Sequence, residues 1–458
     1  MKTKITLLLI ALSVGFSTSY AQQDEECINN LSIFDSYAKN KKYDEAYESW
    51  MKVRKKCPKF NRAIYVRGEK ILEHKIKTSS GADKIAFEAD LLKLYDEYNK
   101  YYGSKFKTGK MFAKKGNLSY KYRKELGLSD EELYDIFNQG YTQDLENFND
   151  PKALYTYFSL IVDLYDAGKK SAQEMFDKYD DVNDKIEEEV GKNTLSLNKL
   201  LKKEEGQELT RREKSIAKSN KSYLKVYDDI SGSMDTKIGD RATCDVLIPL
   251  YQKDFEEKKN DAKWLQRAMN KMYSKECTDD PMFEKLVAQK NNLEPDAGTA
   301  YYLGVLNEKK GRVSEAEKYY KQAESLETDP LKKWNYVFRR AEKNKKKGAY
   351  GKARQLYREA LQLNPSKGTP YLRIAAMYAS SAKNCGDTTL KKRAVYWLAA
   401  SEARKAGQID GRLRSVSSKT AASYQGLAPD KTMLFTEGLK SGDKINISCW
   451  IGASVRVP

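Results

Sequence analysis

Two segments near opposite ends of this 458-residue chain share one spacing of small and large side chains. Each has an alanine, a large aromatic residue four positions later, a small residue three positions after that, and a closing proline. These residues are Ala46, Trp50, Val53 and Pro58 in residues 40–58, and Ala353, Tyr357, Ala360 and Pro365 in residues 347–365. Positions three and four apart lie on one face of an α-helix. The pattern therefore predicts a helix that approaches a neighbour closely at its small residues, fills the groove with its ring and ends at the proline.

This spacing resembles the second helix of a tetratricopeptide repeat (TPR), a helical hairpin that stacks with its neighbours into a solenoid. Residues 27–58 form one such unit, and three more begin near Ala297, marked by Ala316, Ala353 and Ala394. The resemblance covers about a third of the chain. It implies an all-α solenoid that binds partners on a concave surface and rarely carries chemistry. The large aromatic residues expected to be buried between helices are Trp50, Tyr320 and Tyr357.

On these patterns the chain divides into six segments. They are a signal peptide (1–21), N-terminal TPR-like hairpins (22–181), long charged helices or a linker (182–241), a disulfide-bracketed helix pair (242–295), C-terminal TPR repeats (296–408) and a β-hairpin tail (409–458). Strand-like alternation is found only in residues 444–450 and 453–457. The predicted fold class is therefore all-α, a TPR-like helical-hairpin solenoid with a small C-terminal β-hairpin tail.

We expect the tail to cover the last repeat, because the end of a repeat array leaves an apolar face that must be shielded. The final predicted helix, residues 391–405, carries Val395, Trp397 and Leu398 on such a face. The tail residues expected to cover it are Leu434, Phe435, Ile445, Ile447, Trp450, Ile451 and Val455.

The first residues have the order of a secretory signal peptide. Lys2 and Lys4 precede an apolar run over residues 5–16, and Ser19 and Ala21 form a small-x-small cleavage site. We therefore expect export to the periplasm, or secretion, after cleavage at Ala21. Cys27 follows acidic residues, so a lipid anchor is not expected. We expect no transmembrane segment in the rest of the chain, which lacks a run of about 18 apolar residues.

Six cysteines in an exported chain favour disulfides. Cys27 and Cys57 fall at neighbouring ends of the first hairpin, and Cys244 and Cys277 bracket a second helix pair in the same way. Elimination leaves Cys385 with Cys449. Zinc is disfavoured because no pair has CxxC spacing and the chain has one histidine, His74. We expect no metal site and no cofactor.

The formal charge of +18 admits anionic partners, but the 83 basic and 65 acidic residues are interspersed as on solvated helix faces. Export argues against nucleic acid as the partner. The motif DISGSM, residues 229–234, resembles the metal-binding DxSGS loop of von Willebrand A domains, yet it follows a lysine-rich helical segment instead of a buried strand. We interpret it as the turn that ends a long helix. His74 is interpreted as a surface or packing residue, so we predict that the protein is not an enzyme.

The tail, with Ser448–Gly452 reading SCWIG and a final Val457-Pro458, resembles the ends of exported TPR proteins of Bacteroidota-type Gram-negative bacteria. That resemblance implies a periplasmic solenoid, and we predict a scaffold or adaptor that binds protein or peptide partners in a concave groove. The alternative is an adaptor associated with the cell wall or with glycans, and more remotely a metal-dependent protein that uses the DxSGS loop. By repeat register, the predicted groove residues are Asn307, Arg339, Arg340, Tyr371 and Arg373.

Overall fold

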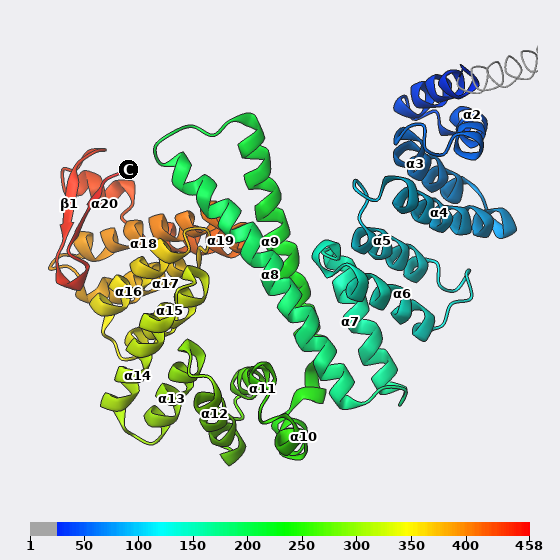
Figure 1. The fold of residues 1–458 in the computed structure, drawn as a ribbon. Helices are drawn as coiled ribbons and strands as arrows, with labels where there is room; N and C mark the ends of the chain where they lie inside the picture. The colour runs from blue at the N-terminus through cyan, green and yellow to red at the C-terminus, as the bar shows by residue number, and fades with distance from the viewer. Residues whose placement is uncertain (1–24) are drawn as a thin grey trace, which may run out of the picture. The chain divides into compact units, whose positions relative to one another are not determined.

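The computed structural model describes residues 25–458, and the predicted signal peptide lies outside them. The chain forms two compact units, Met1–Val182 (unit 1) and Asn183–Pro458 (unit 2), drawn in Figure 1. In both units the described residues form mainly antiparallel helical hairpins, and unit 2 ends in a small sheet. The predicted fold class, an all-α TPR-like solenoid with a β tail, is confirmed. In residues 25–458, no helix is both long enough and apolar enough to cross a membrane.

The first helix in the described part of unit 1 covers residues 25–39. The helices that follow are α2 (Tyr43–Lys56), α3 (Ala63–Thr78), α4 (Gly81–Tyr102), α5 (Thr108–Lys121), α6 (Asp130–Gln143), α7 (Pro151–Asp166) and the first part of α8 (Ala172–Glu204). Their starts follow from local sequence. Ser129 and Glu132 form the capping box of α6, and Asp150 caps α7 ahead of Pro151. Gly168, with φ +72°, makes the turn between α7 and α8.

Unit 2 contains the rest of α8 and a row of shorter helices. These are α9 (Arg211–Ile238), α10 (Cys244–Lys258), α11 (Ala262–Ser274), α12 (Pro281–Leu293), α13 (Ala297–Lys309), α14 (Val313–Leu326), α15 (Pro330–Lys346), α16 (Tyr350–Leu363), α17 (Thr369–Ser381), α18 (Thr389–Ile409), α19 (Arg414–Leu427) and α20 (Lys431–Thr436). The strands β1 (Lys444–Ile447) and β2 (Ala453–Arg456) pair antiparallel, with Ile445 opposite Val455.

Large rings packed onto glycines hold neighbouring helices close together. Tyr320 of α14 covers Gly304 of α13 so tightly that a Cβ at position 304 would lie 2.6 Å from the ring. Trp50 covers Gly68 in the same way, also at 2.6 Å. Trp50, Tyr320 and Tyr357 are buried, as predicted from their place after a small alanine. The sequence pattern therefore identified the residues that set the distance between helices.

Replacing Gly304 by alanine should destabilise the protein by about 1–3 kcal/mol, because the new methyl group would force the Tyr320 ring out of its place. Gly232, inside α9, has open space around it, and a Cβ added there would meet nothing within 4 Å. Gly232→Ala is thus the matched control and should stabilise the protein by about 0.5–1 kcal/mol through helix propensity. Denaturant unfolding of the purified variants measures both. Equal effects of the two substitutions would contradict the packing described here.

The six cysteines form three bonds, Cys27–Cys57, Cys244–Cys277 and Cys385–Cys449, with Cα atoms 6.4, 5.5 and 5.3 Å apart. These are the three predicted pairs. The first two join the ends of helix pairs, and the third joins the tail to the segment between α17 and α18. Each bond closes a loop of 30 or more residues, so each restricts the unfolded chain.

The charged region 182–241 is a long helical hairpin of α8 and α9, with Gly206 in the connection between them. The DISGSM motif lies inside α9, so the prediction that it forms a turn is wrong. Ser233 Oγ donates to the carbonyl oxygen of Asp229 at 2.8 Å, and the Asp229 carboxylate pairs with Lys225. A serine side chain that donates a hydrogen bond to a carbonyl oxygen of the preceding turn can be accommodated within a helix. The helix α9 therefore continues through this motif and ends at Gly239.

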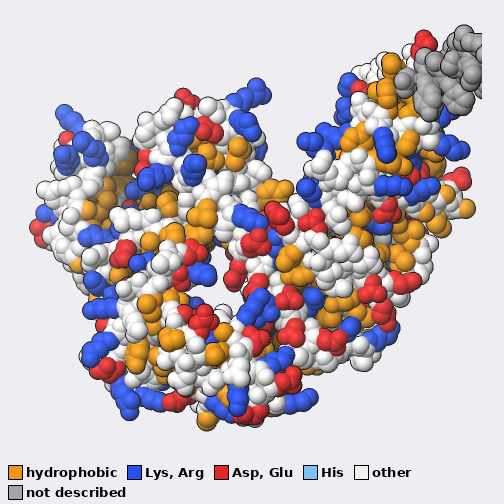
Figure 2. All heavy atoms as spheres, in the orientation of Figure 1, with side chains coloured by type: hydrophobic (Ala, Val, Ile, Leu, Met, Phe, Trp, Pro, Cys, Tyr) orange, Lys and Arg blue, Asp and Glu red, His pale blue; other side chains and the backbone are white. Residues whose placement is uncertain are grey.

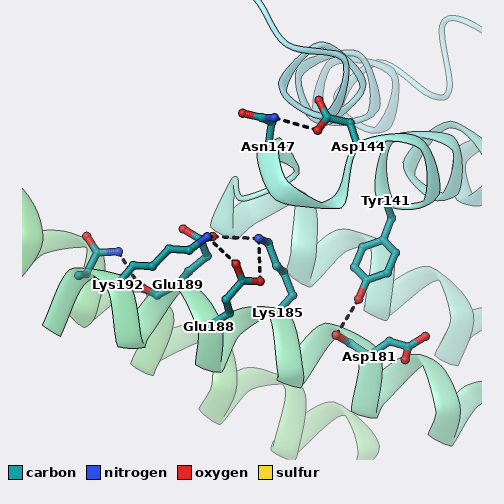
Figure 3. A network of polar contacts seen from close by, with 9 residues as sticks. Tyr141, Asp144, Asn147, Asp181, Lys185, Glu188, Glu189 and Lys192 are labelled. Carbon is teal, nitrogen blue, oxygen red and sulfur yellow. Dashed lines mark hydrogen bonds and ion pairs between the residues drawn. The ribbon is translucent and has the colours of Figure 1, made fainter. Parts of the chain in front are cut away.

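Ion pairs run along α8 (Figure 3). Lys185, buried in unit 2, lies 2.9 Å from Glu189 and 3.1 Å from Glu188, and Lys192 contacts both glutamates from the next turn. Separately, in unit 1, Tyr141 of α6 donates its hydroxyl proton to the carbonyl oxygen of Asp181 at 2.7 Å. Spacings of three and four residues place these charges on one helix face and stabilise an α8 of 33 residues.

Within unit 2, the α8–α9 hairpin contacts both ends of the row of shorter helices. At one end, Asp184 pairs with Lys263 and Arg267 of α11. At the other end, Asn198 accepts the Ser366 backbone N–H at 3.0 Å, and Asp228 lies 3.7 Å from Arg412. Figure 2 shows a hollow in this unit, edged by acidic and basic side chains. The long hairpin therefore bridges the row from its first helices to its last.

Lys367 lies at the second of these junctions, with its ammonium 3.9 Å from the centre of the Trp334 ring. Burial lowers the pKa of Lys367 to about 8, and the Arg412 guanidinium acts in the same direction. Below pH 8 the lysine is protonated in both the folded and unfolded states, and the folded state carries the cost of the buried charge. Between about pH 8 and 10.4 the unfolded state binds more protons, so this cost is relieved as the pH rises.

Lys367→Met should therefore raise the free energy of unfolding at neutral pH by about 1–3 kcal/mol. The gain over the wild type should shrink as the pH approaches about 9.5, because the wild-type lysine is then neutral in the folded state. Chemical unfolding of both proteins at several pH values measures the difference directly. A gain that does not change with pH would mean that the lysine charge is not what destabilises this junction.

The C-terminal segment covers the last repeat, but it is more helical than predicted. Residues 409–458 were expected to be a β-hairpin tail, yet α19 packs along α18 before the sheet begins. Val395 and Trp397 are buried in one apolar core with Ile445, Ile447 and Ile451 of the tail. Trp450 donates its indole N–H to Ser381 Oγ at 2.9 Å, and the Ile451 carbonyl accepts from Arg354 at 2.6 Å.

Phe435 departs from the expected cap, because 87% of its side chain is exposed on α20. A helix as short as α20 points only some of its side chains at the core, and Met433 and Leu434 take those positions. Phe435 was therefore assigned to the covering face wrongly.

Deleting residues 432–458, together with Cys385→Ser to remove the unpaired thiol, should expose Val395 and Trp397. We expect the truncated protein to bind a hydrophobic dye and to lose at least about 3 kcal/mol of stability, since several fully buried side chains lose their partners. Phe435→Ser is the control and should leave both dye binding and stability unchanged. A truncated protein with unchanged melting would show that the tail does not act as a cap.

Candidate functional site

A groove of about 840 Å³ lies among α11, α13, α14 and α15 in unit 2. Its lining combines tyrosines with charged side chains of both signs. The lining residues are Tyr273, Ser274, Glu276, Thr278, Asp279, Tyr301, Val305, Glu308, Lys309, Tyr320, Arg339, Arg340, Glu342, Lys343 and Lys346.

Two parallel stripes of side chains form the sides of this groove. The stripe on α13 consists of Tyr301, Val305 and Glu308, and the stripe on α15 contains Arg339 and Lys343. Steps of three and four residues keep each stripe on one helix face. Asp296 with Thr299 caps α13, and Asp329 caps α15 ahead of Pro330, so both helices start at fixed points. The local sequence thereby fixes which side chains face the groove.

At the centre, one arginine lies against two tyrosine rings. The Arg339 guanidinium carbon is 4.9 Å from the ring centre of Tyr273 and 4.8 Å from that of Tyr301. The two tyrosine hydroxyls are 3.0 Å apart, and their rings meet edge to face at 5.9 Å. Burial raises the pKa of Tyr301, so its hydroxyl stays protonated and can donate a hydrogen bond. Arg339 is exposed, shares a side-chain hydrogen bond with Tyr301 and forms no ion pair with a carboxylate of residues 25–458.

The other charges of the groove are mostly paired. Glu308 accepts from Lys343 at 2.8 Å and from the Tyr320 hydroxyl at 2.9 Å. Burial alone would raise the pKa of Glu308, but these two hydrogen bonds outweigh it and the pKa is lowered. Arg340 pairs with Glu324, and Glu342 accepts from the Tyr357 hydroxyl. These pairs hold the walls in one arrangement and leave Arg339 as the exposed guanidinium at the centre.

A disulfide fixes the third wall. The segment from Glu276 to Asp279 follows α11, and its Cys277 is bonded to Cys244 at the start of α10. Glu276 has φ +60°, a left-handed conformation that the bonded neighbour helps to maintain. Thr278 and Asp279 on this segment line the groove, and Asp279 pairs with Lys309 of α13.

The five predicted groove residues are only partly brought together. Arg339 and Arg340 line the groove. Arg373 does not line it but pairs at 2.9 Å with Glu342, which does. Asn307 donates to the Leu303 carbonyl in its own helix, and Tyr371 lies under Arg358 at 5.3 Å. Of the three helices that carry the predicted residues, α13 and α15 line the groove and α17 does not.

Sequence reasoning missed Tyr273, Tyr301, Glu308 and Lys343. Lys343 could have been found, because it stands four residues from the predicted Arg339 on the same face of α15. Tyr273 could not, because its position depends on how the disulfide-bracketed pair packs against α13.

Residues 25–458 hold no group of three or more His, Cys, Asp or Glu side chains placed to share a metal ion. His74, in unit 1, lies 2.9 Å from Asp44 and against the Tyr43 ring. The groove itself offers hydrogen-bond donors, apolar ring edges and one stacked cation, a set suited to recognising a ligand.

Stacked helical hairpins around such a groove define a TPR-like helical-repeat protein. No family model and no curated protein matches the chain. Among solved structures, a tetratricopeptide repeat protein from Parabacteroides merdae is 12% identical and covers 66% of this chain and 93% of its own, with a TM-score of 0.24. The human IFIT1 dimer with PPP-AAAA is 12% identical over 77% and 73%, with a TM-score of 0.29. Yeast Tom70 is 11% identical over 90% and 83%, with a TM-score of 0.26.

Proposed function

We propose that this protein is a non-catalytic scaffold or adaptor that binds a protein or peptide partner in the groove of unit 2. The observation that carries the proposal is Arg339, an exposed side chain that is stacked on Tyr273 and Tyr301 and has no carboxylate partner in residues 25–458. A guanidinium fixed in this way recognises carbonyl or carboxylate oxygens at little cost in side-chain entropy.

The size and mixed lining of the groove favour a peptide segment over a small metabolite. A volume of about 840 Å³ accommodates several residues of an extended chain. Tyrosine and arginine are the side chains that most often supply binding energy at protein interfaces. Ion pairs in the groove walls, such as Glu308 with Lys343, are already formed and need not rearrange when the partner binds.

We further propose that the protein works after export, in the periplasm. The three disulfide bonds support this location, because such bonds persist in oxidising compartments. The predicted signal peptide agrees with it. Mass spectrometry of the protein from its native host should find an N-terminus at residue 22 and no free thiols.

The groove is tested by capturing partners from an envelope fraction with mature protein, residues 22–458, and with Arg339→Ala. Specific partners should be lost or weakened by at least about 1 kcal/mol, roughly fivefold, because the stacked cation lies at the centre of the contact. Arg414→Ala is the matched control, since Arg414 is an exposed arginine of the same unit on α19. Partners retained equally by both variants would contradict the assignment of this groove.

The cell-wall or glycan adaptor is tested in the same preparation. Sedimentation of the mature protein with purified cell wall, unaffected by Arg339→Ala, would support that alternative over peptide binding. Loss of sedimentation only in the Arg339 variant would instead assign the glycan to this groove.

A further inference from the structure

Unit 1 contains a second groove, of about 330 Å³, formed by α3, α4, α5 and α7. It is built from an apolar floor with charged side chains around it. The lining residues are Glu69, Glu73, Ile76, Lys77, Leu91, Tyr95, Lys114, Asn117, Leu118, Lys121, Tyr122 and Lys152. The predicted groove residues all belong to unit 2, so this second site is new.

Four lysines from three helices converge on this groove, against two glutamates. Both glutamates already have lysine partners. Glu69 pairs with Lys114 and accepts from the Tyr95 hydroxyl at 3.1 Å, and Glu73 pairs with Lys70 at 2.8 Å.

Three of the four lysines form no direct ion pair with a carboxylate in the described part of unit 1. Lys77 and Lys152 form no ion pair with any carboxylate in the described part of unit 1, and Lys121 lies over the Tyr122 ring at 4.6 Å. The nearby carboxylates are engaged elsewhere. Asp150 accepts from Asn117 and caps α7. Glu88 is buried 3.6 Å from Lys84, and burial raises its pKa although the charges of Lys84 and Lys121 act to lower it. The groove therefore carries a net positive charge, in contrast to the paired walls of the groove in unit 2.

We propose that the groove of unit 1 binds an acidic peptide segment in which carboxylates alternate with apolar side chains. The carboxylates would pair with Lys77, Lys121 and Lys152, and an apolar side chain would cover Leu118, the aliphatic lining residue that is only partly buried. The site lies in a different unit from Arg339, so the chain has two separate binding surfaces that differ in charge.

The shape of the site favours a peptide over other polyanions. The groove is a concavity lined by four helices, whereas an anionic membrane presents a flat surface. Tyr95 and Tyr122 are almost fully buried, and the Tyr122 ring is flanked by Lys84 and Lys121, so neither ring offers an open face on which a sugar could stack.

The test uses fluorescence anisotropy of mature protein, residues 22–458, with a labelled peptide of alternating glutamate and leucine. We expect it to bind, to weaken as salt rises, and to bind more tightly than a matched peptide of alternating glutamine and leucine. The triple variant Lys77→Gln, Lys121→Gln, Lys152→Gln should weaken binding at least about tenfold. The control Lys42→Gln, Lys55→Gln, Lys105→Gln removes three exposed lysines that do not line the groove and should bind like the wild type.

Several results would overturn the proposal. These are equal binding of both peptides, equal binding by the two triple variants, or binding only to heparin or to phosphatidylglycerol vesicles used in parallel. Circular dichroism melting checks that both triple variants are folded. Arg339→Ala should leave this binding unchanged, so failure here is distinguishable from failure of the groove in unit 2. Loss of binding in Arg339→Ala would also overturn the site in unit 1.

Discussion

Large aromatic rings packed onto glycines set the distance between helices, and the rest of the structure depends on that contact. Trp50 over Gly68, Phe137 over Gly116 and Tyr320 over Gly304 leave no room for a Cβ atom. Glycine has no side chain, so the aromatic ring occupies the space next to the glycine backbone. The two helix backbones can therefore approach each other closely and form a narrow hairpin. Stacked hairpins of constant width then leave continuous surfaces on which the grooves form.

The same contact explains how much of the fold could be predicted. The spacing of Ala353, Tyr357 and Ala360 is a local property of one helix, so the sequence reveals it directly. The disulfide pairs also followed, because antiparallel hairpins bring the ends of their helices together. The DISGSM segment was placed wrongly for the opposite reason. Glycine and serine favour turns in isolation, but inside α9 the tertiary packing of Tyr227 and Met234 keeps the helix intact.

The grooves were harder to predict, because they depend on contacts between segments far apart in the sequence. Register along α15 identified Arg339, yet nothing local indicated that Tyr273 would stack on it from α11. The groove of unit 1 is distinguished by lysines that form no ion pair. A sequence with 83 basic and 65 acidic residues does not show which of these charges form ion pairs in the folded protein. Charge pairing is a property of the folded surface. The polarity of each groove therefore emerges only after the helices are stacked.

The α8–α9 hairpin changes how unit 2 should respond to stress. In an open solenoid each repeat contacts only its neighbours, so the terminal repeats can fray one at a time. Here Asp184 holds α11, while Asn198 and Asp228 hold the loops after α16 and α18. Losing either end of the row also breaks contacts made by the hairpin, and the hairpin in turn holds the opposite end. Because these contacts close on themselves, we expect unit 2 to unfold in one cooperative step, as a globular domain does, although it is assembled from repeats.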